Sequence, residues 1–588
     1  MLGSGLRDAH MTLIDPVPAR RPLVKRRPPS PLRELEALKS IHDPRAARRK
    51  LALLVRLERT TLPRPADVHA LHEILLVLCA YPDTAAVRRR AERVLARFER
   101  RADLQRHAGA LAGSGIAGTA TPYPFFAPTA AWLARHHGAH LTIDWDAIDE
   151  ESETELLEEL LPLMALYAET PGLDLAPLSL REWIATMKGR RETDAAFLIS
   201  RLMALPMSER VREVLHNKVG LPFVLAPGPG TPARTRALTR RAPVHVQTAP
   251  LRRGRPDLAA EIVRPPRAIA PATRAAAREL IDLAHGMLVA TNRELDIFSY
   301  ASTDDVLLAD CGEGLVFAFI GFTPDRRLLL ETLYGYVIFK NGVFMGYGTV
   351  ACLFASAEVA FNIADTFRGG EASFVFSRLL AATRQLFGTD SFSLDPYQIG
   401  ADNEEAIASG AWWFYQKLGF RPRDRAARAL MRRELRRMAA DPEHRSTRPT
   451  LERLATASVF FHLGRRRDDV LGIFPLADVG IAVTRFLAAR FGGEREHAEE
   501  ECARTAARLL GLRSFAGFTT GERLWWRRWA PLVCALPGVA RWPAADRRAL
   551  AAVIRAKGSR REAEFVALFD AHARLRRALA TLATLATK

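Results

Sequence analysis

The chain has 588 residues, 48% of them apolar, so it can bury more than one hydrophobic core and has room for about four domains of ordinary size. No stretch approaches the roughly 20 consecutive apolar residues that a membrane helix needs, which argues against a membrane partner. The first 31 residues carry Asp and Pro where a signal peptide has an apolar block. We therefore expect a soluble, cytoplasmic protein.

The charge of the chain is unevenly distributed. The formal net charge is +19, which is typical of proteins that bind nucleic acid, but only 9 of the 85 basic residues are Lys, a bias that a GC-rich genome also explains. Residues 301–420 hold 7 basic and 14 acidic residues, a net charge of −7. An acidic surface attracts cations and repels nucleic acid, so this part favours a small-molecule or peptide amine as its partner over nucleic acid.

The cysteines predict neither a disulfide framework nor a metal site. They are odd in number, far apart and mostly set among apolar neighbours, unlike the clustered cysteines of small secreted domains or zinc sites. We expect buried thiols and no bound metal, at Cys79, Cys311, Cys352, Cys502 and Cys534.

The first part of the chain is predicted to be helical. Residues 1–31 are rich in Pro and Arg without periodicity, which indicates a disordered or loosely docked tail. Apolar residues recur at helical spacing over 32–218, which predicts an α-helical domain. Pro and Gly interrupt this pattern over 219–270, where we expect a basic, extended arm with an edge strand at "PVHVQTAP".

A module with a β-sheet is predicted over residues 271–424. After a helix at "TRAAARELIDLAHGMLVATN", strand patterns crowd together for the only time in the chain, at "DVLLAD", "GLVFAFIGF", "RLLLETLYGYVIFK", "VFMGYGTVACLF", "EVAFNIADTF" and "SFSLDPYQ". Asn341-Gly342 is a strong hairpin signal. No strand is evident after Phe420, and residues 425–588 return to helical spacing. The expected fold is a mixed α+β chain, in which a central mixed sheet is flanked by N- and C-terminal helical regions.

The segment 361–388, "FNIADTFRGGEASFVFSRLLAATRQLFG", predicts a strand that turns into a helix through an Arg-Gly-Gly-Glu corner. The first N–H groups of such a helix are free and its dipole favours anions, so the corner can hold a phosphate. Gly369 and Gly370 allow close approach of a ligand, and Arg368 can pair with a phosphate oxygen. The steric demand of a tight corner explains the glycines equally well.

The order of these elements, with "GVFMGYG" before the corner and "DNEEAIASGAWWFYQKLGF" after it, resembles the GNAT superfamily of N-acyltransferases over about residues 300–422. The terminal "FYQKLGF" is the most specific part. The resemblance implies that acetyl coenzyme A or another acyl coenzyme A is the cofactor. It implies contacts to that cofactor from Asn362, Ile363, Ala364, Arg368, Gly369, Gly370, Glu371, Ala372 and Asn403. Counted from Arg368, Glu371 stands where the family has Gly, and it would repel pyrophosphate if it pointed inward.

Acyl transfer from a thioester to an amine needs a base for the amine, a polarised carbonyl and a proton for the leaving thiolate. The resemblance implies Tyr415 as the general acid and N–H groups around 362–364 as donors to the carbonyl oxygen. Glu358 and Asp365 lie on or beside the same strand and are candidate bases, directly or through water. Core packing is the competing explanation for Tyr415, and solvation or ion pairing for the two carboxylates.

The sequence thus predicts an enzyme that moves an acyl group, in the first instance acetyl, from coenzyme A to a primary amine. The alternative is a non-catalytic chain with a GNAT-like fold that has lost its cofactor and binds nucleic acid or a protein through its basic helical regions. Residues 421–467, with 14 Arg and 5 acids, can contact phosphate or form a solvated helix face. An open cleft at the corner favours the enzyme, and a corner plugged by Phe367 or Glu371 favours the alternative.

Overall fold

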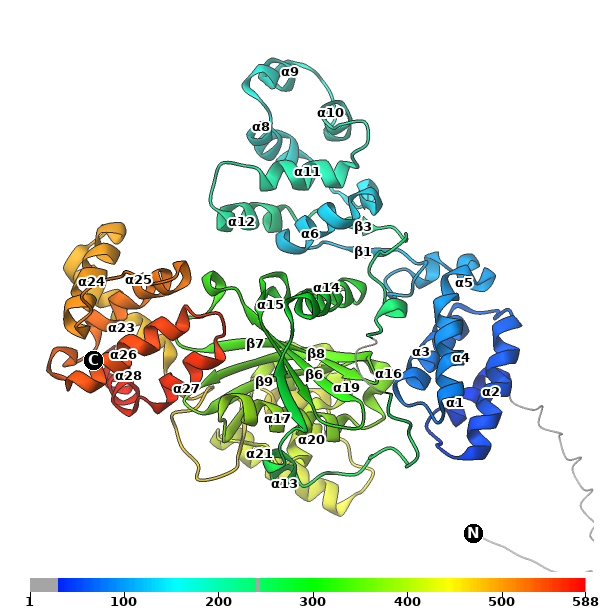
Figure 1. Cartoon of the computed structure of the whole chain (residues 1–588). Coiled ribbons are helices and arrows are strands. Elements are labelled where there is room, and N and C mark those ends of the chain that lie inside the picture. Colours follow the sequence, from blue (N-terminus) through cyan, green and yellow to red (C-terminus); the bar gives the residue numbers. More distant parts are fainter. Residues whose placement is uncertain (1–29, 240–243, 587–588) are drawn as a thin grey trace, which may run out of the picture.

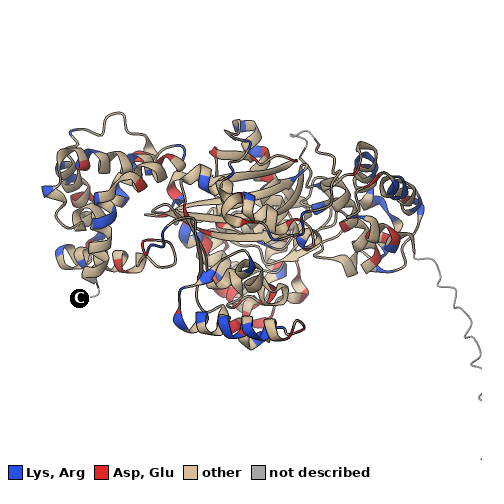
Figure 2. Ribbon diagram, turned by 90° about the horizontal axis from the view of Figure 1, so that it is seen from below, with Lys and Arg blue, Asp and Glu red and all other residues tan. Residues whose placement is uncertain are grey.

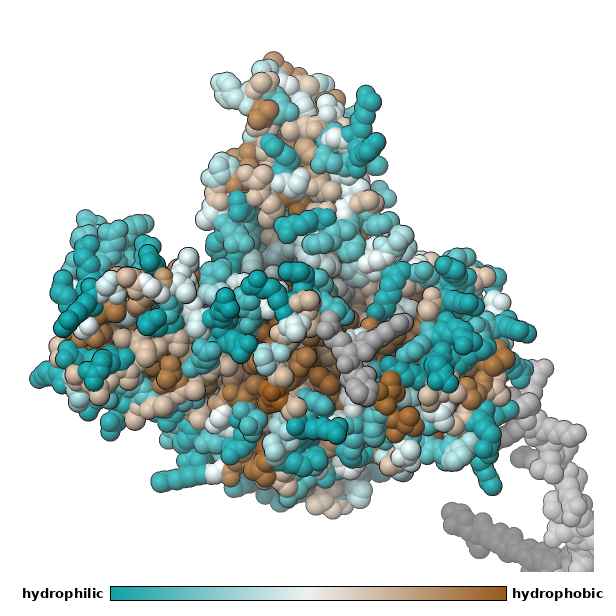
Figure 3. Space-filling model, in the orientation of Figure 1, coloured by the Kyte–Doolittle hydropathy of each residue, from teal (hydrophilic) through white to brown (hydrophobic). Residues whose placement is uncertain are grey.

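The structure is a computed structural model that describes residues 30–239 and 244–586 (Figure 1). A large mixed sheet lies at the centre, and groups of helices surround it on several sides. Hydrophilic side chains dominate the outer parts of these groups, whereas apolar residues gather toward the middle of the molecule (Figure 3). Within the described residues, no helix is both long and apolar enough to cross a membrane.

The N-terminal region contains two helical groups with separate surroundings. The first group packs into the same core as the central sheet, and its third helix is buried along most of its length. Its helices are α1 (Pro31–Leu38), α2 (Pro44–Arg59), α3 (Pro65–Ala80), α4 (Ala85–Ala96) and α5 (Ala102–Arg106). The predicted tail lies outside the described residues except for positions 30 and 31.

The second group has its own hydrophobic core. Its helices are α6 (Ala127–His137), α7 (Glu150–Glu155), α8 (Leu161–Met164), α9 (Thr170–Leu175), α10 (Leu180–Met187), α11 (Asp194–Met203) and α12 (Glu209–Val219). A small sheet of order β1-β3-β2 joins them, from β1 (Thr121–Tyr123), β2 (Leu141–Ile143) and β3 (Phe223–Leu225). The prediction of helix throughout 32–218 is therefore wrong at β1 and β2, because three-residue strands are too short to show a period of two.

The central sheet has nine strands in the order β11-β12-β10-β9-β8-β7-β6-β5-β4. Neighbouring strands are antiparallel except for the parallel pair β9 and β10. The strands are β4 (Ala268–Pro271), β5 (Ala301–Asp310), β6 (Leu315–Phe322), β7 (Thr332–Lys340), β8 (Val343–Leu353), β9 (Ser356–Ile363), β10 (Ser391–Leu394), β11 (Arg421–Pro422) and β12 (Val459–His462).

The six predicted strands correspond to β5–β10 and are confirmed. The hairpin at Asn341-Gly342 is confirmed as well, since both residues have positive φ, 51° and 77°, as a tight turn between twisted strands requires. The predicted edge strand "PVHVQTAP" is wrong: residues 244–250 form no strand, and residue 243 lies outside the described part. The edge position is taken by β4, and β11 and β12 close the other side although no strand was expected after Phe420.

Helices cover both faces of the sheet. On one face α14 (Arg274–Ala290) and α15 (Asp296–Ser299) pack over β5–β8, and on the other α17 (Ala372–Phe387) packs beneath the centre (Figure 1). α13 (Leu258–Val263) lies against α17. The C-terminal region adds α21 (Arg425–Ala440), α22 (Arg448–Leu454), α23 (Leu476–Phe491), α24 (Arg495–Leu510), α25 (Thr520–Ala535), α26 (Ala544–Lys557), α27 (Ala563–Ala571) and α28 (Ala573–Ala586).

The parallel strands β9 and β10 pair only at their beginnings. Their register runs from Ser356–Ser391 to Glu358–Ser393 and then stops. β10 ends at Leu394, and α18 (Pro396–Ile399) carries the chain away, so the last residues of β9 have no strand beside them on that side. The space beside the end of β9 is therefore bounded by residues 397–415 and not by a strand.

The two helical segments beside this space differ from the prediction. The corner does not lead directly from strand to helix, because a short helix, α16 (Asp365–Arg368), precedes the two glycines. The helix expected after Asn403 is divided at Gly410, whose left-handed φ of 67° ends α19 (Glu404–Ser409) and begins α20 (Ala411–Lys417).

Candidate functional site

A cavity of about 520 Å³ lies beside the end of β9. Its walls come from the loop 293–295 after α14, the end of β9, the corner at 368–372, and the segment 397–415 that contains α18–α20. This volume is within the usual range for small-molecule sites, and its lining has more polar and charged side chains than apolar ones. Six of the twelve site residues predicted from the sequence line it: Asn362, Ile363, Arg368, Ala372, Asn403 and Tyr415.

Tyr415 forms part of the cavity wall although it is only 2% exposed. Its hydroxyl oxygen accepts a hydrogen bond from Gln398 Nε2 at 2.9 Å. Burial raises the pKa of the phenol well above its ordinary value, so it stays protonated at neutral pH. The ring also packs edge-on against Phe376. Tyr415 is thus both a core residue and a group with a proton at the cavity surface.

Gln398 replaces the missing strand beside the end of β9. Its Oε1 accepts from the Phe361 N–H at 3.2 Å, and its Nε2 donates to the Phe361 carbonyl at 3.0 Å. Backbone N–H and C=O groups point to alternate sides along an antiparallel strand. The backbone N–H of Asn362 therefore points toward β8, and that of Ile363 points toward the cavity. The Ala364 N–H donates to the Met345 carbonyl on β8 at 2.8 Å. Of the three amides predicted to contact a carbonyl, only that of Ile363 is directed toward the cavity.

The Arg-Gly-Gly corner adjoins the cavity through Arg368 and Ala372, whereas Gly369 and Gly370 are not part of its wall. Arg368 is a wall residue that pairs with Asp365 at 2.6 Å and with Glu405, and its Nε donates to the Ile363 carbonyl at 3.2 Å. No atom lies within 4 Å of the position that a side chain on Gly369 would occupy. A ligand can therefore approach the backbone at Gly369.

Neither Phe367 nor Glu371 plugs the cavity. Phe367 is 3% exposed and belongs to the core. Glu371 is 2% exposed, its Oε2 lies 3.5 Å from Lys340 Nζ, and its Oε1 accepts from the Arg252 N–H at 3.2 Å. The carboxylate that replaces the family's Gly is thus directed into the interior, where Lys340 balances its charge.

The basic arm crosses the beginning of α17. Ser373 Oγ donates to the Gly254 carbonyl at 3.2 Å, and the Arg252 guanidinium lies 4.2 Å from the Phe374 ring centre. Ala372 remains in the cavity wall. The arm therefore covers one side of the helix N-terminus and leaves Gly369 exposed, whereas Ala372 is 8% exposed.

The remaining predicted residues lie at the rim of the cavity or outside it. Asn403 caps α19, because its Oδ1 accepts from the Ala406 N–H at 3.0 Å, and it lines the mouth. Asp365 is 84% exposed and bound to Arg368, so it is a solvated carboxylate and not a wall residue. Glu358 is also absent from the wall, and it lies four residues before Asn362, about 13 Å along the strand.

Glu358 nevertheless has an unusual environment. Burial, with Asp395 and Glu331 nearby, raises the pKa of its carboxyl to about 7. Such a value suits a general base, but only where the group reaches the substrate. Its place on β9 sets it apart from the cavity that holds Tyr415.

Glu294 is a cavity residue that the sequence pattern did not reveal. It follows α14, and its carboxylate accepts from the Phe126 N–H at 3.0 and 3.2 Å. Burial above all, with a contribution from Asp296, raises the pKa of this carboxyl. A lone Glu in a loop carries no sequence signal, and only the packing of the loop against the end of β9 brings it to the cavity.

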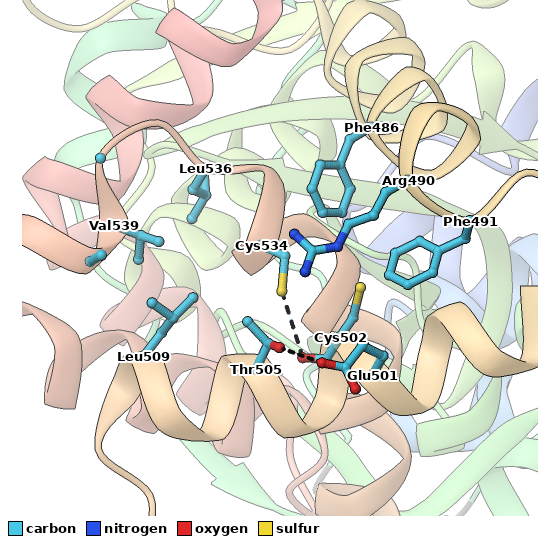
Figure 4. Close-up of a pocket in the computed structure, with 12 residues that line it drawn as sticks. Phe486, Arg490, Phe491, Glu501, Cys502, Thr505, Leu509, Cys534, Leu536 and Val539 are labelled. Atoms are coloured by element: carbon cyan, nitrogen blue, oxygen red, sulfur yellow. Dashed lines mark hydrogen bonds between the residues drawn. The ribbon is translucent and has the colours of Figure 1, made fainter.

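A second cavity, of about 290 Å³, lies among α23–α25 in the C-terminal region (Figure 4). Cys502 and Cys534 line it, and the Cys534 Sγ donates to the Cys502 carbonyl at 3.6 Å. Burial raises the pKa of the Cys534 thiol to about 12, so it is a poor nucleophile at neutral pH. All five cysteines are free thiols, each buried or half-buried as expected. Among the described residues, no three His, Cys, Asp or Glu side chains are grouped to bind a metal.

Comparisons with known proteins add no relative of this chain. Family models, curated proteins and solved structures were compared, and none matches it significantly. Function is therefore inferred from the geometry of the cavity at the end of β9 and from the sequence pattern around it.

Proposed function

We propose that this protein is an acyltransferase that moves an acyl group from an acyl coenzyme A to a primary amine, as the resemblance of residues 300–422 to GNAT enzymes implies. The observation that carries the proposal is the end of β9, which has no strand beside it on one side and which leaves the Ile363 N–H and the Tyr415 hydroxyl on one cavity. An amide donor and a protonated phenol are the two groups that thioester aminolysis needs at the carbonyl and at the leaving sulfur.

The corner offers a place for the pyrophosphate of the cofactor. The first hydrogen bond within α17 runs from the Val375 N–H to the Glu371 carbonyl, so the four preceding N–H groups are not used by the helix. The helix dipole favours an anion there, and Gly369 and Ala372 leave its approach free. The Glu371 carboxylate, which would repel the anion, forms an ion pair with Lys340.

In the reaction, the thioester supplies an activated acyl carbon, and the protein supplies donors and a base. The Ile363 N–H polarises the acyl carbonyl, and Tyr415 donates its proton to the sulfur as the carbon–sulfur bond breaks. Glu294 accepts a proton from the amine as the carbon–nitrogen bond forms. Gln398 holds the Tyr415 oxygen and the Phe361 backbone together, which fixes the distance between the phenol and β9.

The charge of the cavity mouth favours a cationic acceptor. Acidic residues at the mouth, at positions 294, 402, 404 and 405, outnumber the two arginines, at 293 and 368. Glu405 forms ion pairs with both arginines, and its Oε2 lies 2.9 Å from Arg293 Nη2. Glu404 pairs with Arg448, which is not a wall residue, so Glu294 and Asp402 are the carboxylates of the described wall that attract an ammonium group, which must lose one proton before it attacks.

We expect acetyl coenzyme A to bind the full chain and to raise its melting temperature. A ligand at about one hundred times its Kd stabilises the folded state by about 2.7 kcal/mol. Gly369→Val adds a side chain in the open space beside the corner, at a φ that Val tolerates, and should abolish binding without unfolding the protein. Isothermal calorimetry and thermal melting measure both effects.

Gly464→Val is the matched control, because Gly464 also has open space around it and lies in a loop far from the cavity. It should bind acetyl coenzyme A as the parent does. Absence of heat and of any melting shift in the parent protein at millimolar acetyl coenzyme A would refute the proposed function.

Replacing Glu294 with Gln should slow acyl transfer roughly 10²-fold, the lower end for loss of a general base, because solvent at the mouth can accept the proton. A base acts only when deprotonated, so the parent should lose activity as the pH falls toward its raised pKa. The variant should lack that limb of the pH profile. Glu358→Gln is the control. Glu358 is also a largely buried carboxylate with a raised pKa, but it lies outside the cavity wall, so its loss should change turnover only a few-fold. If Glu358→Gln slowed turnover more than Glu294→Gln, Glu358 would be the base and the role proposed for Glu294 would be wrong.

A further inference from the structure

Basic residues are spread over all parts of the molecule, and in most places acidic residues lie beside them (Figure 2). One helix departs from this mixture. α21 carries six Arg and a single acid, Glu434. That acid is 1% exposed and is held by Arg437, His444 and Ser446. The outward face of α21 therefore presents only positive charge.

The exposed arginines of α21 have no counter-ions. Arg425, Arg432, Arg433 and Arg436 are exposed, and within the described residues none of them forms an ion pair or a side-chain hydrogen bond. The helix α24 is also rich in arginine, but there Arg504 and Arg508 both pair with Glu501. An arginine-rich composition is thus compatible with paired charges, and α21 lacks them.

More arginines adjoin this face from other parts of the chain. Arg421 and Arg423 lie at β11, directly before α21. Burial and the charge of Arg255 in the arm lower the pKa of Arg421. Burial and the charges of Arg466 and Arg428 lower the pKa of Arg423, against the opposing effect of Asp468, which lies 2.7 Å from Arg423 Nη1. Like charges therefore crowd together around α21, and an anion placed among them would relieve their repulsion.

We propose that this surface, made of Arg425, Arg432, Arg433 and Arg436 with Arg421 and Arg466 beside them, binds the phosphodiester backbone of a nucleic acid. Arg425, Arg432 and Arg436 follow one stripe of the helix over about 16 Å, so they present a row of charges to a linear polyanion. Guanidinium groups match phosphate with two parallel hydrogen bonds, which an ammonium group does not.

Two other partners fit the surface less well. A membrane-bound helix inserts an exposed apolar face, whereas the apolar side of α21, with Ala427, Leu430 and Met431, is buried in the protein. A protein interface has a centre of aromatic or apolar anchors, and Leu435, 36% exposed, is the sole large apolar side chain among the exposed described residues of α21. The inference does not depend on the acyltransferase proposal.

The test is fluorescence anisotropy of a labelled 20-base-pair DNA duplex and a 20-nucleotide RNA with the full chain, over a series of salt concentrations. The logarithm of the binding constant should fall linearly with the logarithm of salt concentration. The triple variant Arg432→Gln, Arg433→Gln, Arg436→Gln should reduce the slope by about two to three, because each phosphate contact contributes about 0.7 to 0.9. Its melting temperature should not change, since the three side chains are exposed.

The triple variant Arg89→Gln, Arg93→Gln, Arg97→Gln, at and just beyond the end of α4, removes the same charge from exposed side chains elsewhere. It should leave the slope within about one contact of the parent value. Equal losses in the two triple variants would mean diffuse attraction to a basic protein and would overturn the proposal, as would no binding at low salt. The proposal would also fail if the α21 triple variant lost binding to phosphatidylserine vesicles but kept binding to nucleic acid.

Discussion

Replacement of Tyr415 by Phe is expected to slow acyl transfer by roughly 10²- to 10⁴-fold, the usual loss when a general acid is removed. Phe keeps the ring in its edge-on contact with Phe376, and Gln398 keeps both of its hydrogen bonds to Phe361. The single bond lost, from Gln398 Nε2 to the phenol, is worth about 0.5–1.5 kcal/mol. Turnover should therefore fall far more than stability, while the affinity for acetyl coenzyme A stays within a few-fold.

Thiol release with a screened amine acceptor measures the rate, and thermal melting and calorimetry measure the other two quantities. Tyr397→Phe is the matched control, since Tyr397 lines the same cavity but is 61% exposed, and its loss should change turnover little. If Tyr415→Phe transfers acetyl groups at the parent rate, the proton of the leaving thiolate comes from solvent and Tyr415 is a packing residue.

The second large effect is expected at the contact between the C-terminal helices and the central sheet. Lys557 is fully buried, and its Nζ donates to Glu562 Oε1 at 2.5 Å and to the Glu331 carbonyl at 2.7 Å. Arg327 donates to the Lys557 carbonyl at 2.7 Å, and the Glu562 N–H donates to Asp305 at 2.9 Å. These groups form one buried network of charges that joins α26 and α27 to β5 and β7.

Lys557→Met should lower the free energy of unfolding by about 3–5 kcal/mol, because it leaves the buried Glu562 carboxylate with only the more distant Arg327, whose Nε lies 3.7 Å from Glu562 Oε2. The double variant Lys557→Met, Glu562→Leu should recover part of that loss, since it removes the charge that was stranded. Arg448→Met is the exposed control: Arg448 is 57% exposed and pairs with Glu404 and Glu452, and its loss should cost at most about 1 kcal/mol. Urea unfolding followed by tryptophan fluorescence measures all three.

A double variant that is less stable than Lys557→Met alone would contradict the stranded-charge explanation. It would show that the packing of the two side chains, and not their charges, joins the C-terminal helices to the sheet.

The elements of the central sheet were predictable because each is a local pattern. The strands β5–β10 have β-branched and aromatic runs separated by short turns, and the hairpin depends on two adjacent residues that accept positive φ. Strands set by pairing with distant segments were missed. Thirty-six residues separate the end of β11 from the start of β12, and β12 pairs with both β10 and β11. No local sequence pattern predicts that pairing.

The candidate site divides in the same way. Tyr415, Arg368 and Asn403 stand in motifs, and all three reach the cavity wall. Glu358 and Asp365 lie on or beside the same strand in sequence, but Glu358 is about 13 Å along the strand from Asn362, and a helical turn directs Asp365 to solvent. Neighbouring positions thus have different surroundings, which their order in the chain does not reveal.

By itself, the sequence determined the central strands, the glycine corner and the tyrosine near the end of "FYQKLGF", because these depend on residue type and spacing over a few positions. Only the tertiary structure decided that Glu371 turns to Lys340, that Gln398 takes the place of a strand beside Phe361, and that Glu294 reaches the cavity. Each of these contacts joins residues more than 30 positions apart, or depends on which side of a strand a group faces. Burial and charge pairing across such distances are set when the elements pack together, and no local pattern encodes them.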